Sequence, residues 1–344
     1  MLHALEQQFP GKVRQPVAGM DFFLVSDFDK FAGLDAATFL GDLDASVPVR
    51  HAGDDIVPGA LQWVAGDHPS LRYRGNELKR RKIWLQDGSV EEFVLVYGYT
   101  GFTWPVARAT SDWAGCEPVQ AASAKVNEMA AVLGAPPVNH AIVTAYDGGS
   151  HNIGFHYDKA HSLDDNTLIA VLKLGPASRP FALRRRVGQD LEAQAAKIEA
   201  AGFSKGEARQ KAKQLAGKKQ EAEPCVFNEV VPAGTLILMS MEANLATQHA
   251  VPAVEDEKVG LSGSIVWRRV YMAYSQGILA RKIAATERGS AKRQADKAAA
   301  AAASKLTRTS APAKSRWVDE DERFAQEVEE HVKRAPVALQ SDSE

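Results

Sequence analysis

A histidine and a carboxylate stand two positions apart in the segment His156-Tyr157-Asp158. On an extended segment, side chains two residues apart point to the same side, so one metal ion can take both as ligands. The pair alone is weak evidence, because nine histidines and 43 acidic residues in a chain of 344 give about one such pair by chance. Its position is more informative: the pair follows an apolar run at 140–146 and a Gly-rich turn, and it precedes the apolar run 168–175. These surroundings predict a metal site at the end of a strand.

A third ligand would have to come from elsewhere in the chain. His249 follows the apolar run 234–240, which places it near another strand end. Two histidines and one carboxylate on one side of a metal leave positions open for substrates, which favours a non-haem Fe(II) oxygenase over a closed structural zinc site. Taken alone, His249 would be interpreted as a hydrogen-bonded histidine at a strand end.

Two arginines, Arg268 and Arg269, interrupt the apolar segment SIVWRRV. A guanidinium inside an apolar strand is costly to bury unless an anion meets it. Strand alternation allows only one of the two to point inward, where it can bind a carboxylate through two parallel hydrogen bonds, as a 2-oxoacid would require. The alternative places both at an exposed strand edge.

Short apolar runs rich in β-branched and aromatic residues predict the strands that would position these groups. They are 22–25, 93–98, 140–146, 168–175, 234–240 and 263–274. Helices are expected near 30–45 and at Ser123–Gly134, where the apolar spacing is three to four. This order predicts a β-sandwich or open barrel flanked by N-terminal helices.

Two segments depart from that pattern. Residues Asp190–Gln220 are rich in Ala, Lys, Glu and Gln and predict a helical hairpin, with Gly202 and Gly217 as helix ends. Beyond residue 280 the chain is first Ala-rich and basic and then acidic, which predicts a tail that is helical or disordered.

The composition is that of an ordinary soluble globular protein, with 45% hydrophobic residues, 24% charged residues and a net charge of -2. It excludes collagen-like, fully disordered and disulfide-scaffold classes. No apolar run is long enough to span a membrane, and the N-terminus lacks the pattern of a secretory signal. Two distant cysteines, Cys116 and Cys225, predict an intracellular, reducing compartment, the cytoplasm or the nucleus.

Four segments together resemble the AlkB family of Fe(II)/2-oxoglutarate-dependent dioxygenases. They are AYDGGSHNIGFHYDKAHSL, LIAVLKLGPASRPFALR, AGTLILMSMEANLATQHAVP and GSIVWRRV, and the likeness extends over roughly Asp21 to Tyr274. The resemblance implies a mainly β, α+β fold with a double-stranded β-helix, or jelly-roll, core. We expect a dioxygenase domain at 1–280 with a basic helical insertion at 186–224, followed by a tail at 281–344.

The resemblance also implies roles for individual residues. His156, Asp158 and His249 would be the iron ligands, Arg268 would bind the distal carboxylate of 2-oxoglutarate, and Tyr146 would contact the same cosubstrate. With Fe(II), 2-oxoglutarate and O2, a member of this family oxidises an alkyl group on a nucleobase of DNA or RNA and releases formaldehyde and succinate. The implied processes are DNA repair and RNA modification.

The chain departs from the family at positions near the cosubstrate. Thr144 stands where the family usually has Asn, and Ser262 stands where many members have an arginine. We expect both residues to lie in the cosubstrate site, where their contacts with 2-oxoglutarate would differ from those of the family. Acidic residues that commonly follow the metal motif are replaced by Lys159, Ala160 and His161, so base specificity does not carry over.

The near-neutral net charge hides basic segments. Residues 184–219 hold ten basic and four acidic residues, a net charge of +6, and residues 281–316 hold ten and two, a net charge of +8. A third basic cluster and a set of aromatic residues suit phosphate contact and base stacking. These residues are Arg72, Arg74, Lys79, Arg80, Arg81 and Lys82, with Trp84, Tyr99, Phe102 and Trp104. We therefore expect a monomer that binds alkylated DNA or RNA and no membrane.

Two other functions remain open from the sequence. An oxygenase of the same fold could hydroxylate a protein side chain or a small molecule. A nucleic-acid-binding module without turnover would follow if Thr144 and Ser262 weaken cosubstrate binding.

Overall fold

The structure is a computed structural model, and it describes residues 1–71, 77–97, 108–158, 160–187, 190–255, 259–285 and 288–289. The chain divides into two compact units. The first comprises residues 1–185 and 224–290, and the second contains residues 186–223. We describe each unit by itself.

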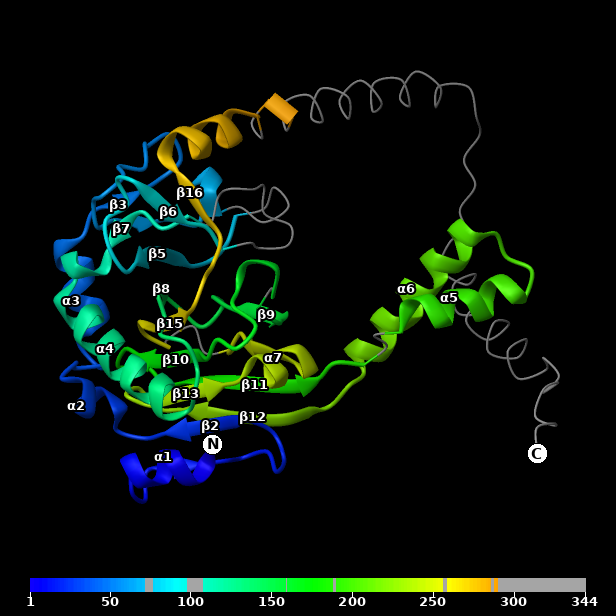
Figure 1. The fold of residues 1–344 in the computed structure, drawn as a ribbon, viewed down its shortest axis with the longest axis horizontal. Helices are drawn as coiled ribbons and strands as arrows, with labels where there is room; N and C mark the ends of the chain where they lie inside the picture. The colour runs from blue at the N-terminus through cyan, green and yellow to red at the C-terminus, as the bar shows by residue number, and fades with distance from the viewer. Residues whose placement is uncertain are drawn as a thin grey trace. The chain divides into compact units, whose positions relative to one another are not determined.

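Eight antiparallel strands in two facing sheets form the centre of the first unit (Figure 1). They are β8 His140–Tyr146, β9 Ile153–His156, β10 Ile169–Leu174, β11 Arg179–Arg185, β12 Cys225–Val231, β13 Leu236–Met239, β14 Thr247–Val251 and β15 Ser262–Arg268. The order β13-β10-β15-β8 lies in the large sheet, and β12-β11-β14-β9 forms the second sheet. Apart from the hairpin β11–β12, each successive strand crosses to the other sheet. This strand order is that of a jelly roll and confirms the predicted double-stranded β-helix.

Additional short strands extend the large sheet at both edges. They are β1 Val13–Arg14 and β2 Phe22–Val25 beside β13, then β5 Arg81–Gln86, β4 Trp63–Val64 and β3 Val49–Arg50 beyond β8, with β7 Ser111–Asp112 paired to β5. Strands β6 (Phe93–Leu95) and β16 (Ala273–Ser275) form a separate antiparallel pair.

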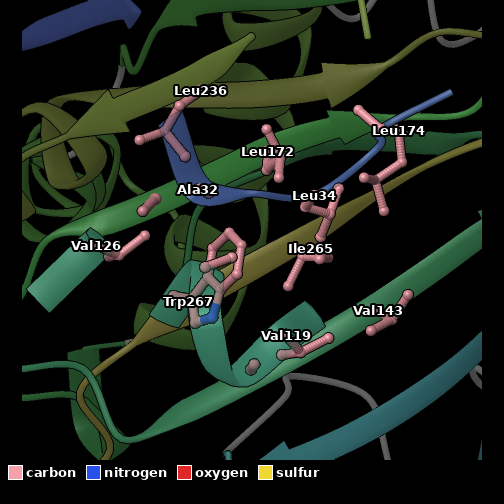
Figure 2. Packing of buried hydrophobic residues seen from close by; sticks show 14 of the residues in the cluster. Ala32, Leu34, Val119, Val126, Val143, Leu172, Leu174, Leu236, Ile265 and Trp267 are labelled. Atoms are coloured by element: carbon pink, nitrogen blue, oxygen red, sulfur yellow. The ribbon is translucent and has the colours of Figure 1, made fainter. Parts of the chain in front are cut away.

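Helices from the N-terminal half cover the outer face of the large sheet (Figures 1 and 2). They are α1 Leu2–Gln8, α2 Phe28–Ala32, α3 Phe39–Ser46 and α4 Glu117–Val132, and a further short helix, α7 Met241–Ala246, precedes β14. Val119 and Val126 of α4 pack against Ile265 and Trp267 of β15 in this outer core, as Figure 2 shows. The indole Nε1 of Trp267 donates a 2.8 Å hydrogen bond to Ser123 Oγ, so its only polar atom is paired despite full burial.

Along the central strands, alternate side chains point to opposite faces of the large sheet, and each face packs in a different core. On β15, Ile265 and Trp267 belong to the outer core, whereas Val266 packs toward the second sheet. On β8, Val143 faces outward and Ile142 faces inward. Both faces of these strands are buried, which explains why their sequences read as nearly continuous apolar runs.

The prediction of a single helix near 30–45 is wrong, because the segment forms two helices. Gly33 ends α2 in the left-handed conformation, with φ of 69°, which glycine adopts without steric cost. The Asp35 carboxylate then accepts hydrogen bonds from the backbone amides of Ala37 and Thr38 before α3 begins. This local turn replaces the continuous helical hydrogen bonding that the apolar spacing suggested.

The strand predicted over 263–274 is also interrupted. It ends at Arg268, and a separate strand begins at Ala273. Between them, the backbone of Val270 exchanges two hydrogen bonds with the side-chain amide of Asn139. The amide of Tyr271 donates to the carbonyl of Ser162. These contacts replace the ladder and turn the chain away from the sheet.

The second unit contains the predicted helical hairpin, α5 Leu191–Ala200 and α6 Lys205–Glu221. Gly202, with φ of 98°, lies between the helices, and Ser204 and Glu207 form a reciprocal capping box at the start of α6. The prediction that Gly217 ends a helix is wrong, because Gly217 lies inside α6. A small apolar cluster joins the two helices; it contains Ala195, Ile198, Ala208 and Ala212.

Little of the predicted tail at 281–344 falls within the described residues. A helix begins at 276 and is described to 285, and the rest of the tail lies outside the described part apart from 288–289. Among the described helices, none has both the length and the apolar character needed to cross a membrane.

Candidate metal centre

The structure brings His156, Asp158 and His249 together. His156 is the last residue of β9 and lies directly opposite His249 of β14 in the antiparallel register, with their ring centroids 4.4 Å apart. Asp158 follows two residues after His156. One potential ligand atom from each of the three residues lies within 4.8 Å of those of the other two. Adjacent strands of the second sheet therefore place two imidazoles and one carboxylate around a common point.

The carboxylate of Asp158 is held by side chains from distant parts of the chain. Arg268, the last residue of β15, donates from Nε to Oδ2 at 2.5 Å and from Nη2 to Oδ1 at 3.2 Å. The hydroxyl of Tyr97 donates to Oδ1 at 2.8 Å. The Arg268 guanidinium also lies over the Tyr97 ring, 4.5 Å from its centroid. Both carboxylate oxygens are thus oriented before any ion binds.

The backbone of Asp158 is fixed as well. Asn244, at 0% exposure on α7, accepts from the Asp158 amide at 2.8 Å and donates to the Asp158 carbonyl at 3.0 Å. This reciprocal pair ties the segment after β9 to the helix that precedes β14. Because β14 carries His249, Asn244 links the positions of two candidate ligands.

Electrostatics keep all three groups in the form that binds a metal. Burial lowers the pKa of His156 to about 3, and the neighbouring His249 adds to the effect. Burial likewise lowers the pKa of His249. For Asp158, burial opposes ionisation, but the charge of Arg268 outweighs it and keeps the pKa below its ordinary value. At neutral pH the site therefore presents two neutral imidazoles and a carboxylate.

The hydrogen bonds of the two histidines fit metal coordination. His156 Nδ1 lies 2.8 Å from the carbonyl of Gly154, which leaves the other ring nitrogen free for an ion. His249 stacks on Phe181, with centroids 5.8 Å apart and planes at 12°, and its Nδ1 is buried without a hydrogen-bond partner. A bound metal ion would give this buried nitrogen a partner. The donor set therefore suits a divalent transition metal.

The residues predicted to bind the cosubstrate lie on the inner face of the large sheet. Tyr146 and Thr144 of β8 lie opposite Ser262 and Ser264 of β15, respectively. All four are buried. Arg268 also points inward, as one member of the arginine pair was expected to do, whereas Arg269 is partly exposed beside Asp164. The guanidinium of Arg268 contacts the Asp158 carboxylate, which sequence alone did not indicate.

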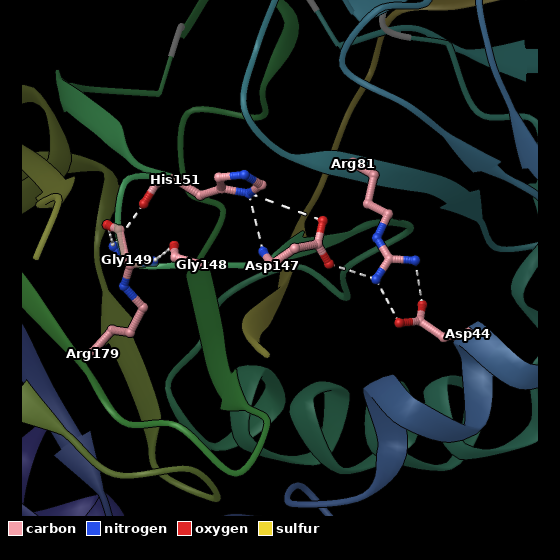
Figure 3. A network of polar contacts seen from close by, with 7 residues as sticks. All are labelled: Asp44, Arg81, Asp147, Gly148, Gly149, His151 and Arg179. Atoms are coloured by element: carbon pink, nitrogen blue, oxygen red, sulfur yellow. Dashed lines mark hydrogen bonds and ion pairs between the residues drawn. The ribbon is translucent and has the colours of Figure 1, made fainter. Parts of the chain in front are cut away.

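A loop connects β8 to β9, the strand that carries His156, and Arg179 braces this loop. The Arg179 guanidinium is fully buried and donates to the carbonyls of Gly148, Gly149, His151 and Pro252. Figure 3 shows this clamp together with the ion pairs that link Asp147 to Arg81 and Arg81 to Asp44. The sequence gave no sign of this role, because Arg179 merely begins a strand.

The structure weakens one part of the expected nucleic-acid surface. Trp84 and Lys82 lie inside the protein at 1% and 4% exposure, and Arg81 forms ion pairs with Asp44 and Asp147. Five further members of the predicted set lie outside the described residues: Arg72, Arg74, Tyr99, Phe102 and Trp104. Trp84 packs in the core between the sheets, so it is not a base-stacking platform.

The helical hairpin is also less basic than the predicted window. Residues 186–223 carry eight basic and six acidic residues, a net charge of +2. The predicted window began with Arg184 and Arg185, which belong to β11, and stopped short of Glu221 and Glu223. Helix α6 itself keeps an excess of positive charge, with six basic and two acidic residues.

Comparisons with known proteins add little to this picture. No family model matches the chain, and no curated protein sequence matches it. The structure is similar to a Trichoplax adhaerens prolyl hydroxylase in complex with a hypoxia inducible factor oxygen degradation domain peptide fragment, with 8% identity, a TM-score of 0.36 and coverage of 78% of this chain and 87% of that one. It is also similar to a prolyl-4-hydroxylase from Pseudomonas putida, with 14% identity, a TM-score of 0.34 and coverage of 73% and 94%. Neither similarity shows a family, and the architecture rests on the strand order of the chain itself.

Proposed function

We propose that the protein is an Fe(II)- and 2-oxoglutarate-dependent oxygenase. The observation that carries the proposal is the convergence of His156, Asp158 and His249 on adjacent strands of a jelly roll. Two imidazoles and one carboxylate on one side of a metal leave coordination positions for a cosubstrate and O2. A structural zinc site would instead close its coordination with four protein ligands, commonly cysteines. The described cysteines, Cys116 and Cys225, are not part of the group.

The metal and the cosubstrate would supply the oxidising chemistry, and the protein would position the reactants. His156, Asp158 and His249 would hold the ion, while Arg268 and Tyr97 keep the carboxylate ionised and oriented. The inner-face residues of β8 and β15 would hold the cosubstrate. The apolar side chains between the sheets would exclude water from it.

Turnover of 2-oxoglutarate tests this proposal. Purified protein is incubated with Fe(II), 2-oxoglutarate and O2, and succinate is measured by mass spectrometry. We expect succinate from the wild type and none above background from His156→Ala or Asp158→Ala. His51→Ala, which changes an exposed histidine, is the control and should behave like the wild type. If the wild type forms no more succinate than His156→Ala, the protein is not such an oxygenase, and the non-catalytic binding module becomes the better hypothesis.

For the substrate, the described residues favour a protein side chain or a small molecule over a nucleobase. The nucleobase hypothesis depended on basic and aromatic surfaces near the site. Lys82 and Trp84 are internal, and the hairpin carries a net charge of only +2. The remaining support for a nucleic acid comes from the charge of α6, from the AlkB-like motifs and from the basic segment 281–316, most of which lies outside the described residues.

Two measurements separate the substrate classes. The first is oligonucleotide binding at increasing salt, because contacts of basic side chains with phosphates weaken steeply as salt is added. The second is mass spectrometry of methylated DNA and RNA oligonucleotides, and of a peptide library, after incubation with the loaded enzyme. Loss of a methyl group from an oligonucleotide would establish the nucleobase function. A mass increase of about 16 Da in a peptide corresponds to one added oxygen atom. Such an increase would establish the protein-hydroxylase function.

A further inference from the structure

A row of polar side chains crosses the inner face of the large sheet. Lys173 of β10 lies opposite Ser264 of β15, Ser264 lies opposite Thr144 of β8, and Thr144 lies opposite Lys82 of β5. All four are exposed by 5% or less. The next row along the same strands is apolar and consists of Val171, Val266, Ile142 and Trp84. A polar row in an otherwise apolar core breaks the local pattern, which is typical of a functional site.

Lys173 is the buried cation without a counter-ion in this row. The described residues bury four cationic side chains, Lys82, Lys173, Arg179 and Arg268, but one carboxylate, Asp158. Arg268 pairs with that carboxylate, and Arg179 donates to four backbone carbonyls. In the described part of the chain, the Lys173 amine has neither a hydrogen-bond acceptor nor an ion-pair partner. Burial of an ammonium without an anion is costly, so an anion that reaches Lys173 would bind favourably.

Burial lowers the pKa of both lysines of the row. Burial lowers the pKa of Lys173 to about 8, with a further contribution from Arg179, so the amine is still mostly protonated at pH 7. Burial also lowers the pKa of Lys82 well below its ordinary value, and Arg80 and Arg268 add to the effect.

Hydroxyl groups surround the Lys173 end of the row. Cross-strand partners have Cβ atoms about 5 Å apart, so Ser264 and then Thr144 are the next side chains across the sheet from Lys173. Ser262, two residues before Ser264 on the same face, has a buried Oγ without a hydrogen-bond partner. An ammonium with hydroxyl side chains next to it across the sheet is a donor set suited to a carboxylate.

We propose that Lys173, with the hydroxyl of Ser264 on the neighbouring strand and that of Thr144 on the strand after it, binds the distal carboxylate of 2-oxoglutarate. This inference rests on the proposed oxygenase function and names the residue that would select a dicarboxylate. It replaces the expectation that Arg268 has this role, because the Arg268 guanidinium contacts Asp158 through two of its nitrogens. It also explains why position 262 can be a serine where the resemblance to AlkB suggests an arginine, since Lys173 on β10 would supply the positive charge.

The test compares two ligands that differ only in the distal carboxylate. Protein loaded with Mn(II) is titrated in a calorimeter with 2-oxoglutarate or with 2-oxopentanoate, which has the same carbon chain and no second carboxylate. We expect Lys173→Met to weaken 2-oxoglutarate binding about 30-fold, the loss typical of a buried charge-assisted hydrogen bond. Binding of 2-oxopentanoate and of Mn(II) should remain within about twofold of the wild type, because neither depends on that contact. Lys30→Met, on the surface at 77% side-chain exposure, is the matched control and should bind both ligands like the wild type.

The outcomes separate this inference from the proposed function. If the wild type binds 2-oxoglutarate and Lys173→Met binds it equally well, Lys173 does not hold the carboxylate, while the oxygenase proposal stands. If the Mn(II)-loaded wild type does not bind 2-oxoglutarate, the proposed function fails and the inference fails with it. If Lys173→Met does not fold, as judged by circular dichroism, Ser264→Ala decides. It removes one hydroxyl beside Lys173 and should weaken 2-oxoglutarate severalfold without affecting 2-oxopentanoate. Unchanged binding of both ligands to Ser264→Ala would then overturn the inference.

Discussion

Arg268 and Asp158 form a buried ion pair in which Nε lies 2.5 Å from Oδ2, and their side chains are 6% and 2% exposed. The pair joins the end of β15 in the large sheet to the segment that follows β9 in the second sheet. A candidate metal ligand is therefore oriented by a residue 110 positions away in the sequence. This contact makes the metal site depend on the packing of the two sheets and not on the His156-Tyr157-Asp158 segment alone.

Replacing this arginine should weaken metal binding. We expect Arg268→Gln to lower the affinity for Mn(II) or Co(II) about 10-fold, because loss of a group that orients a ligand typically costs 10- to 100-fold. Calorimetric titration of the metal measures it. Arg269→Gln is the control, since Arg269 is partly exposed beside Asp164, and its metal affinity should be unchanged. Unaltered metal affinity in Arg268→Gln would show that the ion pair does not position Asp158.

The hydroxyl of Tyr97 should contribute less. Tyr97→Phe removes the 2.8 Å hydrogen bond to Asp158 Oδ1 but keeps an aromatic ring beneath Arg268. We expect the metal affinity to fall about fivefold, which corresponds to the roughly 1 kcal/mol of a typical single hydrogen bond, with the melting temperature nearly unchanged. The same metal titration measures the first effect and thermal unfolding the second. A loss as large as that of Arg268→Gln would mean that the hydroxyl, and not the guanidinium, sets the position of the carboxylate.

Close packing of β8 against β15 requires a glycine at position 263. A Cβ added there would lie 2.3 Å from the backbone carbonyl oxygen of Thr144 and 2.8 Å from a methyl carbon of Leu40. We expect Gly263→Ala to lower the free energy of unfolding by about 2 kcal/mol, the cost of overpacking a rigid core. Gly154→Ala, on β9, meets nothing within 4 Å and should be neutral. Urea denaturation of the two variants measures the difference, and equal stabilities would contradict the prediction.

The strands of the core were predictable because their signal is local. The run HAIVTAY coincides with β8 at both ends, since a strand buried on both faces is apolar throughout. The metal motif was found for the same reason, because His156 and Asp158 share one short segment. His249 was predicted to follow the end of a strand, but it lies in the middle of β14, which helix α7 separates from β13. These inferences required no knowledge of which segments meet in space.

The groups around the motif could not be predicted, because they come from far along the chain. Tyr97 lies 61 positions from Asp158, and Asn244 lies 86 positions from it. Alternation indicated that one arginine of the pair turns inward, but it did not identify the anion that Arg268 meets. Lys173 was hidden inside an apolar run, where nothing local distinguishes a buried lysine from one at a strand edge. Which of these distant side chains meet depends on how the strands are arranged in the two sheets, and no local sequence pattern indicates that arrangement.

Buried His140 should make stability depend on pH. It is 0% exposed and neither ring nitrogen has a hydrogen-bond partner. Burial lowers the pKa of His140 to about 3, with Arg268 and Lys82 adding to the effect and Asp158 opposing it. An unfolded histidine titrates near pH 6.5. Below that pH the unfolded chain binds a proton that the folded chain refuses, so stability falls as the pH decreases from about 6.5 to 3.

The size of the His140 contribution can be isolated by difference. At pH 5 the proton uptake should cost about 2 kcal/mol relative to pH 7. Urea unfolding of the metal-free protein at both pH values should show a smaller loss in His140→Phe than in the wild type. His3→Phe, at an exposed position, should lose as much stability as the wild type. Equal losses in all three proteins would show that His140 does not titrate on unfolding.

The helical hairpin should be dispensable for the metal site. Its apolar cluster, Ala195, Ile198, Ala208 and Ala212, is separate from the cores on either side of the large sheet. The hairpin is inserted between β11 and β12, and these strands are paired where it begins and ends, with Arg184 opposite Cys225. A short turn such as Asn-Gly can connect two antiparallel strands. We therefore expect a variant with 186–223 replaced by that turn to bind Mn(II) with the wild-type affinity and to melt within about 3 °C of the wild type, a shift equivalent to roughly 1 kcal/mol. Loss of cooperative unfolding or of metal binding in that variant would show that the hairpin is required for the fold of the jelly roll.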